Sequence, residues 1–198
     1  MNACFSYWRL STLFAIALFT FSVFARAHEF ERFVTLSGPT GATGTGVISF
    51  DLDLVTMRVQ LQFAGLTSNT LTSHIHATTS NPLAGTSPIA TANFFSSLAG
   101  ATSGTYDQTF DLALGGSYNA AFITSSGGSV ATALSELVIA AENEKAYLSI
   151  KTLAFPTGDG ELKGFLTAVP EPSSFALLGL GVVGLSITRR WLIARQCR

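Results

Sequence analysis

Two histidines separated by one residue, His74 and His76, are the side chains best placed to do chemistry in this sequence. Residues two apart on a strand leave the same face, so these imidazoles can share a zinc or copper ion. A metal usually needs at least one more ligand, and His28 is the only other histidine. In the alternative, both rings hydrogen-bond backbone or carboxylate groups and stiffen the sheet. The shortage of ligands favours this structural interpretation.

His28 supports a second hypothesis, which concerns copper. If the chain is cleaved after Ala27, His28 becomes the first residue. Its free amine and ring nitrogen can then chelate copper while His74 or His76 supplies a third nitrogen. The sequence therefore requires no cofactor, and the cofactor hypothesis is limited to copper or zinc on these three histidines.

Other kinds of catalysis have little support. Cys4 and Cys197 lie in the two ends that we expect to be removed, which excludes a thiol nucleophile or disulfide in the remaining domain. Asp159 and Glu161 stand in a glycine-rich turn that is more typical of a hairpin than of an acid/base pair. Glu161 and Lys163 are expected to be a solvated pair on one strand face that cross-links to a neighbouring strand. We predict no catalytic residues and no enzyme, with metal-dependent redox activity as the alternative.

The first 27 residues have the pattern of a secretory signal peptide. An apolar stretch from Leu10 to Phe24 follows a basic residue, and the small residues Ala25 and Ala27 mark the cleavage site for signal peptidase. An uncleaved membrane anchor is the alternative, but it needs about 20 apolar residues. The sequence therefore predicts export, with the mature chain beginning at residue 28.

The C-terminal end, residues 169–198, has three features in a fixed order. Pro170, Glu171 and Pro172 precede an apolar stretch at 175–188, and Arg189 and Arg190 follow it. As a helix with a rise of about 1.5 Å per residue, this stretch spans about 21 Å, short of a bilayer core of about 30 Å. It is thus a marginal transmembrane helix, and the arginine pair predicts that the domain lies outside the cytoplasm.

These features, over residues 169–191, resemble the PEP-CTERM sorting signal of Gram-negative bacteria. The resemblance implies recognition by an exosortase, a membrane-embedded transpeptidase-like enzyme that removes the tail near Pro-Glu-Pro. It also implies a transient stay at the inner membrane and delivery to the cell surface or an exopolysaccharide matrix. The alternative is a plain C-terminal membrane anchor.

Composition and charge limit the kinds of structure and partner that are expected for residues 28–168. The whole chain has 198 residues, of which 47% are hydrophobic and 12% charged, values that exclude intrinsic disorder. Between residues 28 and 168 there are 11 acidic and five basic side chains, a net charge of −6. Such a domain repels nucleic acid and anionic membranes, so neither is an expected partner.

Alternation of apolar and polar residues dominates this domain and predicts strands with one buried face. Residues 48–54 and 57–63 read as a hairpin. Further strands are predicted at Phe30–Leu36, Leu71–Ala77, Thr105–Leu112, Ser117–Ile123, Lys145–Thr152 and Glu161–Thr167. Helical spacing predicts one short crossover helix over 129–143, capped by Ser129.

The expected fold is therefore all-β, an antiparallel sandwich or barrel, flanked by the N-terminal signal helix and the C-terminal apolar helix. The long irregular stretch from Thr78 to Gly104 is a candidate binding surface, or a tolerated insertion with a short strand near Ala92–Phe95.

Several motifs follow one another in order between residues 33 and 168. They are Leu36-Ser37-Gly38, Phe63-Ala64-Gly65-Leu66, Ser73-His74-Ile75-His76-Ala77 and Gly160-Glu161-Leu162-Lys163-Gly164. Together they resemble a CHRD domain, a module first described in chordin and widespread in bacterial exported proteins. The resemblance implies a Greek-key sandwich weakly similar to Cu/Zn superoxide dismutase and a structural or binding module, since the family has no settled activity. Many CHRD domains have a histidine on the penultimate strand, where this sequence has Lys151, a cation that opposes a metal.

Overall fold

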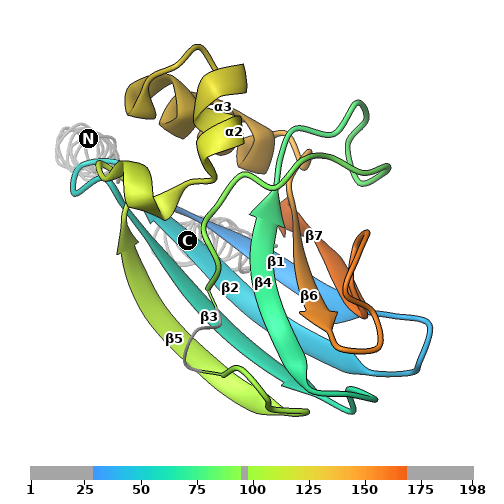
Figure 1. The fold of residues 1–198 in the computed structure, drawn as a ribbon. Helices are drawn as coiled ribbons and strands as arrows, with labels where there is room; N and C mark the ends of the chain where they lie inside the picture. Colours follow the sequence, from blue (N-terminus) through green and yellow to red (C-terminus); the bar gives the residue numbers. More distant parts are fainter. Residues whose placement is uncertain (1–28, 95–97, 169–198) are drawn as a thin grey trace, which may run out of the picture. The chain divides into compact units, whose positions relative to one another are not determined.

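Antiparallel β-strands dominate the computed structural model, which describes residues 29–94 and 98–168. Within these residues, seven strands form one curled sheet in the order β4-β6-β7-β1-β2-β3-β5 (Figure 1). The strands are β1 (Glu29–Ser37), β2 (Thr43–Asp51), β3 (Thr56–Ala64), β4 (Thr70–His76), β5 (Gly104–Asp111), β6 (Tyr147–Thr152) and β7 (Leu162–Ala168). The chain crosses the sheet from β3, which lies next to one edge, to β4 at the opposite edge, and it returns to form β5 beside β3. The predicted all-β class is confirmed.

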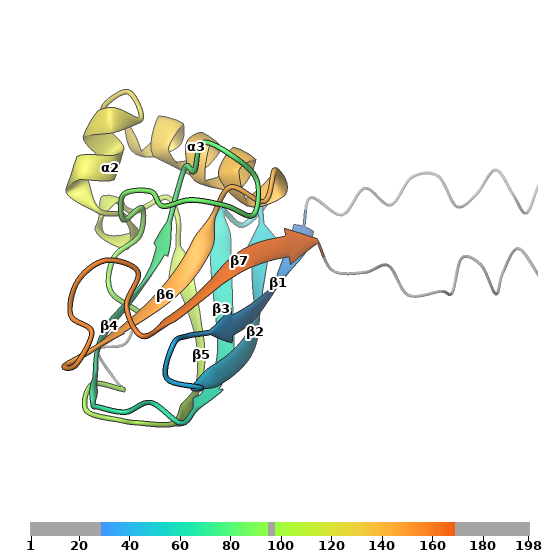
Figure 2. The same ribbon diagram turned by 90° about the vertical axis from the view of Figure 1, so that its right-hand side faces the viewer.

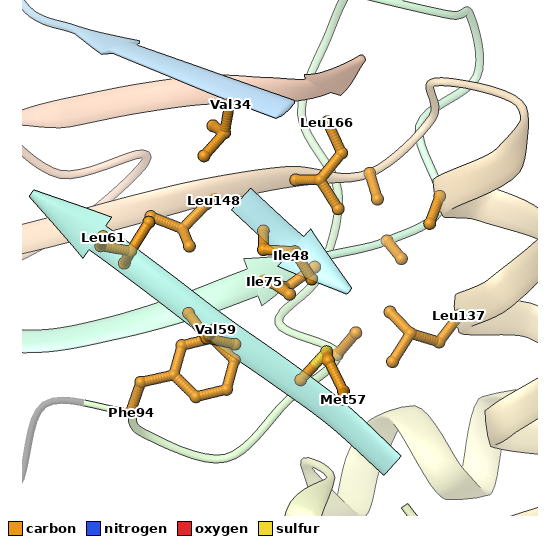
Figure 3. Close-up of a cluster of buried hydrophobic side chains, with 14 of the residues drawn as sticks. Val34, Ile48, Met57, Val59, Leu61, Ile75, Phe94, Leu137, Leu148 and Leu166 are labelled. Atoms are coloured by element: carbon orange, nitrogen blue, oxygen red, sulfur yellow. The ribbon is translucent and has the colours of Figure 1, made fainter. Parts of the chain in front are cut away.

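The core follows from the alternation along the strands. Ile48 and Phe50 of β2, and Val59 of β3, have fully buried side chains, while the polar residues between them face outward. Inward-facing side chains from both halves of the curled sheet converge with Leu137 of a helix (Figure 3). The concave side of the sheet is therefore the hydrophobic core, while polar side chains of β2 and β3 lie on the outer face.

Helices gather at one end of the sheet (Figure 1). The predicted crossover helix is α3 (Val130–Glu142), and Ser129 caps it by accepting a hydrogen bond from the amide of Thr132. At its other end the Arg32 guanidinium donates to the carbonyls of Ala141 and Glu142, at 3.0 and 3.3 Å. A cation at a helix C-terminus is favourable, so Arg32 ties α3 to β1.

One predicted strand is wrong. Residues 117–123 form the end of a 3-10 turn, η2 (Gly115–Ser117), and the short helix α2 (Ala120–Ser125). The side chain of Asn119 accepts a hydrogen bond from the amide of Ala121, which starts α2 in place of a strand. The described residues thus contain two α-helices where the sequence predicted one.

The long irregular segment covers an edge of the sheet. The amides of Ala90 and Phe94 donate to the carbonyls of Ile75 and Ser73 on β4, both at 2.9 Å. Only isolated bridges form here, including Thr91 with Tyr118, so the described part of the predicted short strand near 92–95 is not regular strand. The segment shields backbone groups that an edge strand would expose.

Several predictions fall on residues outside the described ranges: the signal helix, the cleavage sites at Ala25 and Ala27, His28, and the tail from residue 169. Within the described ranges, no helix has both the length and the apolar character needed to cross a bilayer.

Candidate functional site

His74 and His76 share the outer face of β4, as their spacing predicted. The residues between and before them, Ile75 and Ser73, are fully buried on the core side. Strand β6 lies alongside, with His74 opposite Ser149 and His76 opposite Tyr147. The two imidazoles therefore meet the side chains of β6 and not those of the core.

Hydrogen bonds occupy both ring nitrogens of His76. Its Nδ1 lies 2.8 Å from the carbonyl oxygen of Ser87, and its Nε2 lies 3.0 Å from the hydroxyl of Ser149. Because a carbonyl can only accept, Nδ1 carries the proton and Nε2 accepts from the hydroxyl. The ring also stacks on Tyr147, with centroids 4.6 Å apart and an interplanar angle of 12°. A metal could bind this ring only by breaking one of these hydrogen bonds.

His74 is half-buried and uses one ring nitrogen in the same way, with Nδ1 at 3.2 Å from the carbonyl oxygen of Thr91. Burial lowers the pKa of both histidines below the ordinary value, and it outweighs the hydrogen bonds to backbone carbonyls that act in the opposite direction. The positive charge of Lys151 lowers both pKa values further. Both rings are therefore neutral at pH 7.

The metal hypothesis gains no further ligand from the described part of the chain. Across residues 29–94 and 98–168, no three histidine, cysteine, aspartate or glutamate side chains gather where they could hold a metal ion. His28 lies outside these ranges, so its copper site stays a prediction. The contacts of His74 and His76 are those of the structural interpretation.

A second group of side chains, missed by the sequence analysis, lies beside the histidines on the same face. The hydroxyl of Tyr147 donates to Asp159 at 2.7 Å, and Lys163 Nζ donates to the other Asp159 oxygen at 2.8 Å. Lys163 also donates to the carbonyl of Gly85 at 2.6 Å and lies 4.0 Å from the Tyr147 ring centroid. We call His74, His76, Tyr147, Asp159 and Lys163 the outer-face cluster.

Charges within the outer-face cluster balance one another. Burial alone would raise the pKa of the Asp159 carboxyl, but hydrogen bonds from Lys163 and Tyr147 hold it below its ordinary value. Burial and the hydrogen bond to Asp159 raise the pKa of Tyr147. The cluster is thus an ionised Asp–Lys pair with a neutral tyrosine at neutral pH.

The outer-face cluster clamps the irregular segment onto the sheet. Each of His74, His76 and Lys163 donates to a backbone carbonyl of that segment, at Thr91, Ser87 and Gly85 respectively. These donors position a long connection against the sheet. This arrangement holds the irregular segment in one position on the sheet. The outer-face cluster contains no side chain activated as a nucleophile.

Glu161 differs most from its prediction as a solvated partner of Lys163. Its side chain is fully buried, and Lys163 pairs with Asp159 instead. The Glu161 carboxylate accepts hydrogen bonds from the hydroxyls of Thr40 at 2.9 Å and Thr152 at 2.8 Å, and from both the amide and the hydroxyl of Thr67. It therefore joins the β1–β2 connection, the β3–β4 connection and β6.

Hydrogen bonds also decide the charge state of Glu161. Burial disfavours the ionised form, but the donors from Thr67, Thr152 and Thr40 outweigh it and lower the pKa. The group is an ionised structural carboxylate and has no role as a general acid at neutral pH.

The fold and these contacts define the class of protein. It is a domain built on one curled antiparallel sheet, with a long irregular segment hydrogen-bonded to side chains of the sheet's outer face. More particularly, residues 31–166 match the family model of the CHRD domain, and the chain belongs to this family. Residues 168–190 match the PEP-CTERM protein-sorting motif. No curated protein and no solved structure matches the chain. The two family matches support an exported protein that is processed by an exosortase.

Proposed function

We propose that this protein is a structural or binding module of a Gram-negative cell surface or extracellular matrix. In this proposal signal peptidase removes residues 1–27, and residues 28–168 form the exported domain. The tail at 169–198 holds the protein transiently in the inner membrane until an exosortase cleaves near Pro170, Glu171 and Pro172. Exopolysaccharide or another surface matrix is the proposed final partner.

The observation that carries the proposal is the junction between the domain and the sorting motif. The last strand, β7, ends at Ala168, and the matched motif begins at the same residue. A folded domain followed directly by a sorting signal fits a protein whose destination is encoded in its tail. The clamped outer face supports a binding or structural role, and CHRD is not a known enzyme family.

The test is a native mass spectrum of the protein recovered from its own cells, from both membrane and secreted fractions. The proposal expects a chain that starts at residue 28 and ends near Pro170 in the secreted fraction. An intact C-terminus that is found only in membranes would instead indicate a plain membrane anchor. A copper or zinc ion on a chain that begins with His28 would support the metal hypothesis.

Variants of the tail make the same test specific. Changing Glu171 to Ala, or Arg189 and Arg190 to Gln, should leave the full-length protein in the membrane fraction. A matched control is Glu142→Ala, which removes an exposed carboxylate of the domain and should leave processing unchanged. Normal processing of the tail variants would contradict the role of the motif.

A further inference from the structure

The same five-residue pattern, Phe-Asp-Leu-x-Leu, ends two strands of the sheet. It occupies residues 50–54 and 110–114, and its first two residues are the last two of β2 and of β5. In each copy the aspartate carboxylate accepts from the amide two residues later, that of Asp53 at 3.0 Å and that of Ala113 at 2.8 Å. Such side-chain bonds reverse the chain and leave the last leucine of each pattern on a turn.

These two turns lie side by side. Strand β3 runs between β2 and β5, and its first residue, Thr56, pairs with both Asp51 and Asp111. The amide of Leu112 donates to the carbonyl of Val55 at 2.8 Å, which joins the two turns directly.

Three leucines project from these turns. Leu54 is 72% exposed, Leu114 59% and Leu52 38%. We call these three residues the leucine end. Large aliphatic side chains that gather on neighbouring turns have no role in the core and are typical of an interaction surface.

Strand β7, which precedes the sorting tail in the sequence, ends at the same end of the sheet. Glu29, the first residue of β1, pairs with Asp51 at the base of the first turn. Strand β7 ends beside the beginning of β1 (Figure 2), where Thr167 donates to the carbonyl of Phe33 at 3.1 Å. Pro170, near which the proposed cleavage falls, follows Ala168 by two residues in the sequence.

We infer that the leucine end is a contact surface for the exosortase that removes the tail, an inference that rests on the proposed function. An enzyme that cleaves so close to β7 must work against this end of the folded domain. The partner surface that fits is apolar with basic side chains, because acidic residues accompany the leucines. Asp51, Asp53 and Asp111 belong to the same two patterns, and Glu29 pairs with Asp51.

The same charges argue against a lipid surface as the partner. Anionic headgroups give a membrane a negative surface potential, which repels the carboxylates around the leucine end. A protein can instead present a basic side chain to each carboxylate, so the observations favour the enzyme.

The experiment measures the rate of tail removal by pulse-chase in the native cells. Leu54→Gln combined with Leu114→Gln should slow removal about tenfold, as loss of central apolar contacts does in other interfaces. Leu153→Gln is the matched control, because Leu153 is also 59% exposed but follows β6 at the opposite end of the sheet. This control should be processed at the wild-type rate. Urea unfolding of the purified domains checks that all variants fold.

A second arm separates contact from misfolding. Ten Gly/Ser residues inserted between Ala168 and Val169 let the tail reach the enzyme without the domain against it. With this spacer the difference in rate between wild type and the double variant should vanish. A persistent difference would overturn the inference, and so would a wild-type rate for the double variant without the spacer.

Two further outcomes have distinct meanings. If membrane association in cells without exosortase depends on Leu54 and Leu114, the partner is lipid and the inference is wrong. If the wild-type tail is never removed, the proposed function itself fails, and the inference fails with it.

Discussion

Thr67 donates two hydrogen bonds to a single carboxylate oxygen of Glu161, one from its amide at 2.7 Å and one from its hydroxyl at 2.9 Å. The two residues are 94 positions apart in the chain. Thr40 and Thr152 supply the remaining donors, so four hydrogen bonds hold a carboxylate that is fully buried. A buried charge without such donors would be unstable, and the three threonines are therefore as necessary as the acid.

Removal of this carboxylate should cost much of the domain's stability. Glu161→Ala leaves the amide of Thr67 and the hydroxyls of Thr40, Thr67 and Thr152 without their acceptor, which should lower the free energy of unfolding by about 3 kcal/mol. Urea unfolding at pH 7 measures the loss. Glu31→Ala is the matched control, because its carboxylate accepts only an exposed bond from Ser49 and should cost less than about 0.5 kcal/mol. Equal losses for the two variants would contradict this role of Glu161.

Acid should weaken the same attachment. The folded state lowers the pKa of Glu161, whereas in the unfolded chain its pKa is about 4.3. The stabilisation is therefore complete above about pH 4.3 and is lost as the pH falls toward the folded pKa, because the unfolded state then binds more protons. Urea unfolding at pH 3, 4, 5 and 7 should show a steeper loss for wild type than for Glu161→Gln. The comparison isolates Glu161 from Asp159 and Asp107, whose pKa values are also lowered. Parallel curves would show that Glu161 is not the group responsible.

Local periodicity explains how much of the fold could be predicted. Strands such as β2 and β3 alternate because one face is buried, and α3 combines helical spacing with a Ser129 cap. The region at 117–123 alternates only over its first four residues, and Asn119 caps a helix there. Alternation over so few residues does not distinguish a strand from a helix that buries a single side chain, Phe122.

The site was harder to predict because its contacts are long-range. The spacing of His74 and His76 placed both on one face correctly, but their partners come from an irregular connection with no periodic signal. The spacing of Glu161 and Lys163 predicts that they share a strand face. Only the tertiary fold buries Glu161 and pairs Lys163 with Asp159. Threonines from two loops and from the end of β6 give no local sign that they surround a carboxylate.

The clamp on the irregular segment should loosen when Lys163 loses its charge. Lys163→Met keeps an apolar stem against Tyr147 but removes the donors to Gly85 and Asp159. Hydrogen exchange of the Ser87 amide, which donates to the Tyr147 hydroxyl, should become about tenfold faster. Lys151→Met removes the same charge from neighbouring β6, leaves both Lys163 bonds in place and should not change this rate. Unchanged exchange in Lys163→Met would show that the segment is held by other contacts.

The histidines should make stability depend on pH in a separate range. Burial lowers the pKa of His74 and His76 in the folded domain, while a histidine in the unfolded chain titrates near pH 6.5. Their contribution is therefore complete above about pH 6.5 and declines as the pH falls below it, since the unfolded state takes up protons that the folded state refuses. His76→Phe keeps the stacking on Tyr147, lowers stability at every pH and should flatten the loss of stability between pH 7.5 and 5.5. Nitrogen NMR of the rings gives the direct check, with the proton on Nδ1 of both at pH 7.5. A proton on Nε2, or a ring that titrates above pH 6.5, would contradict the hydrogen bonds to Thr91 and Ser87.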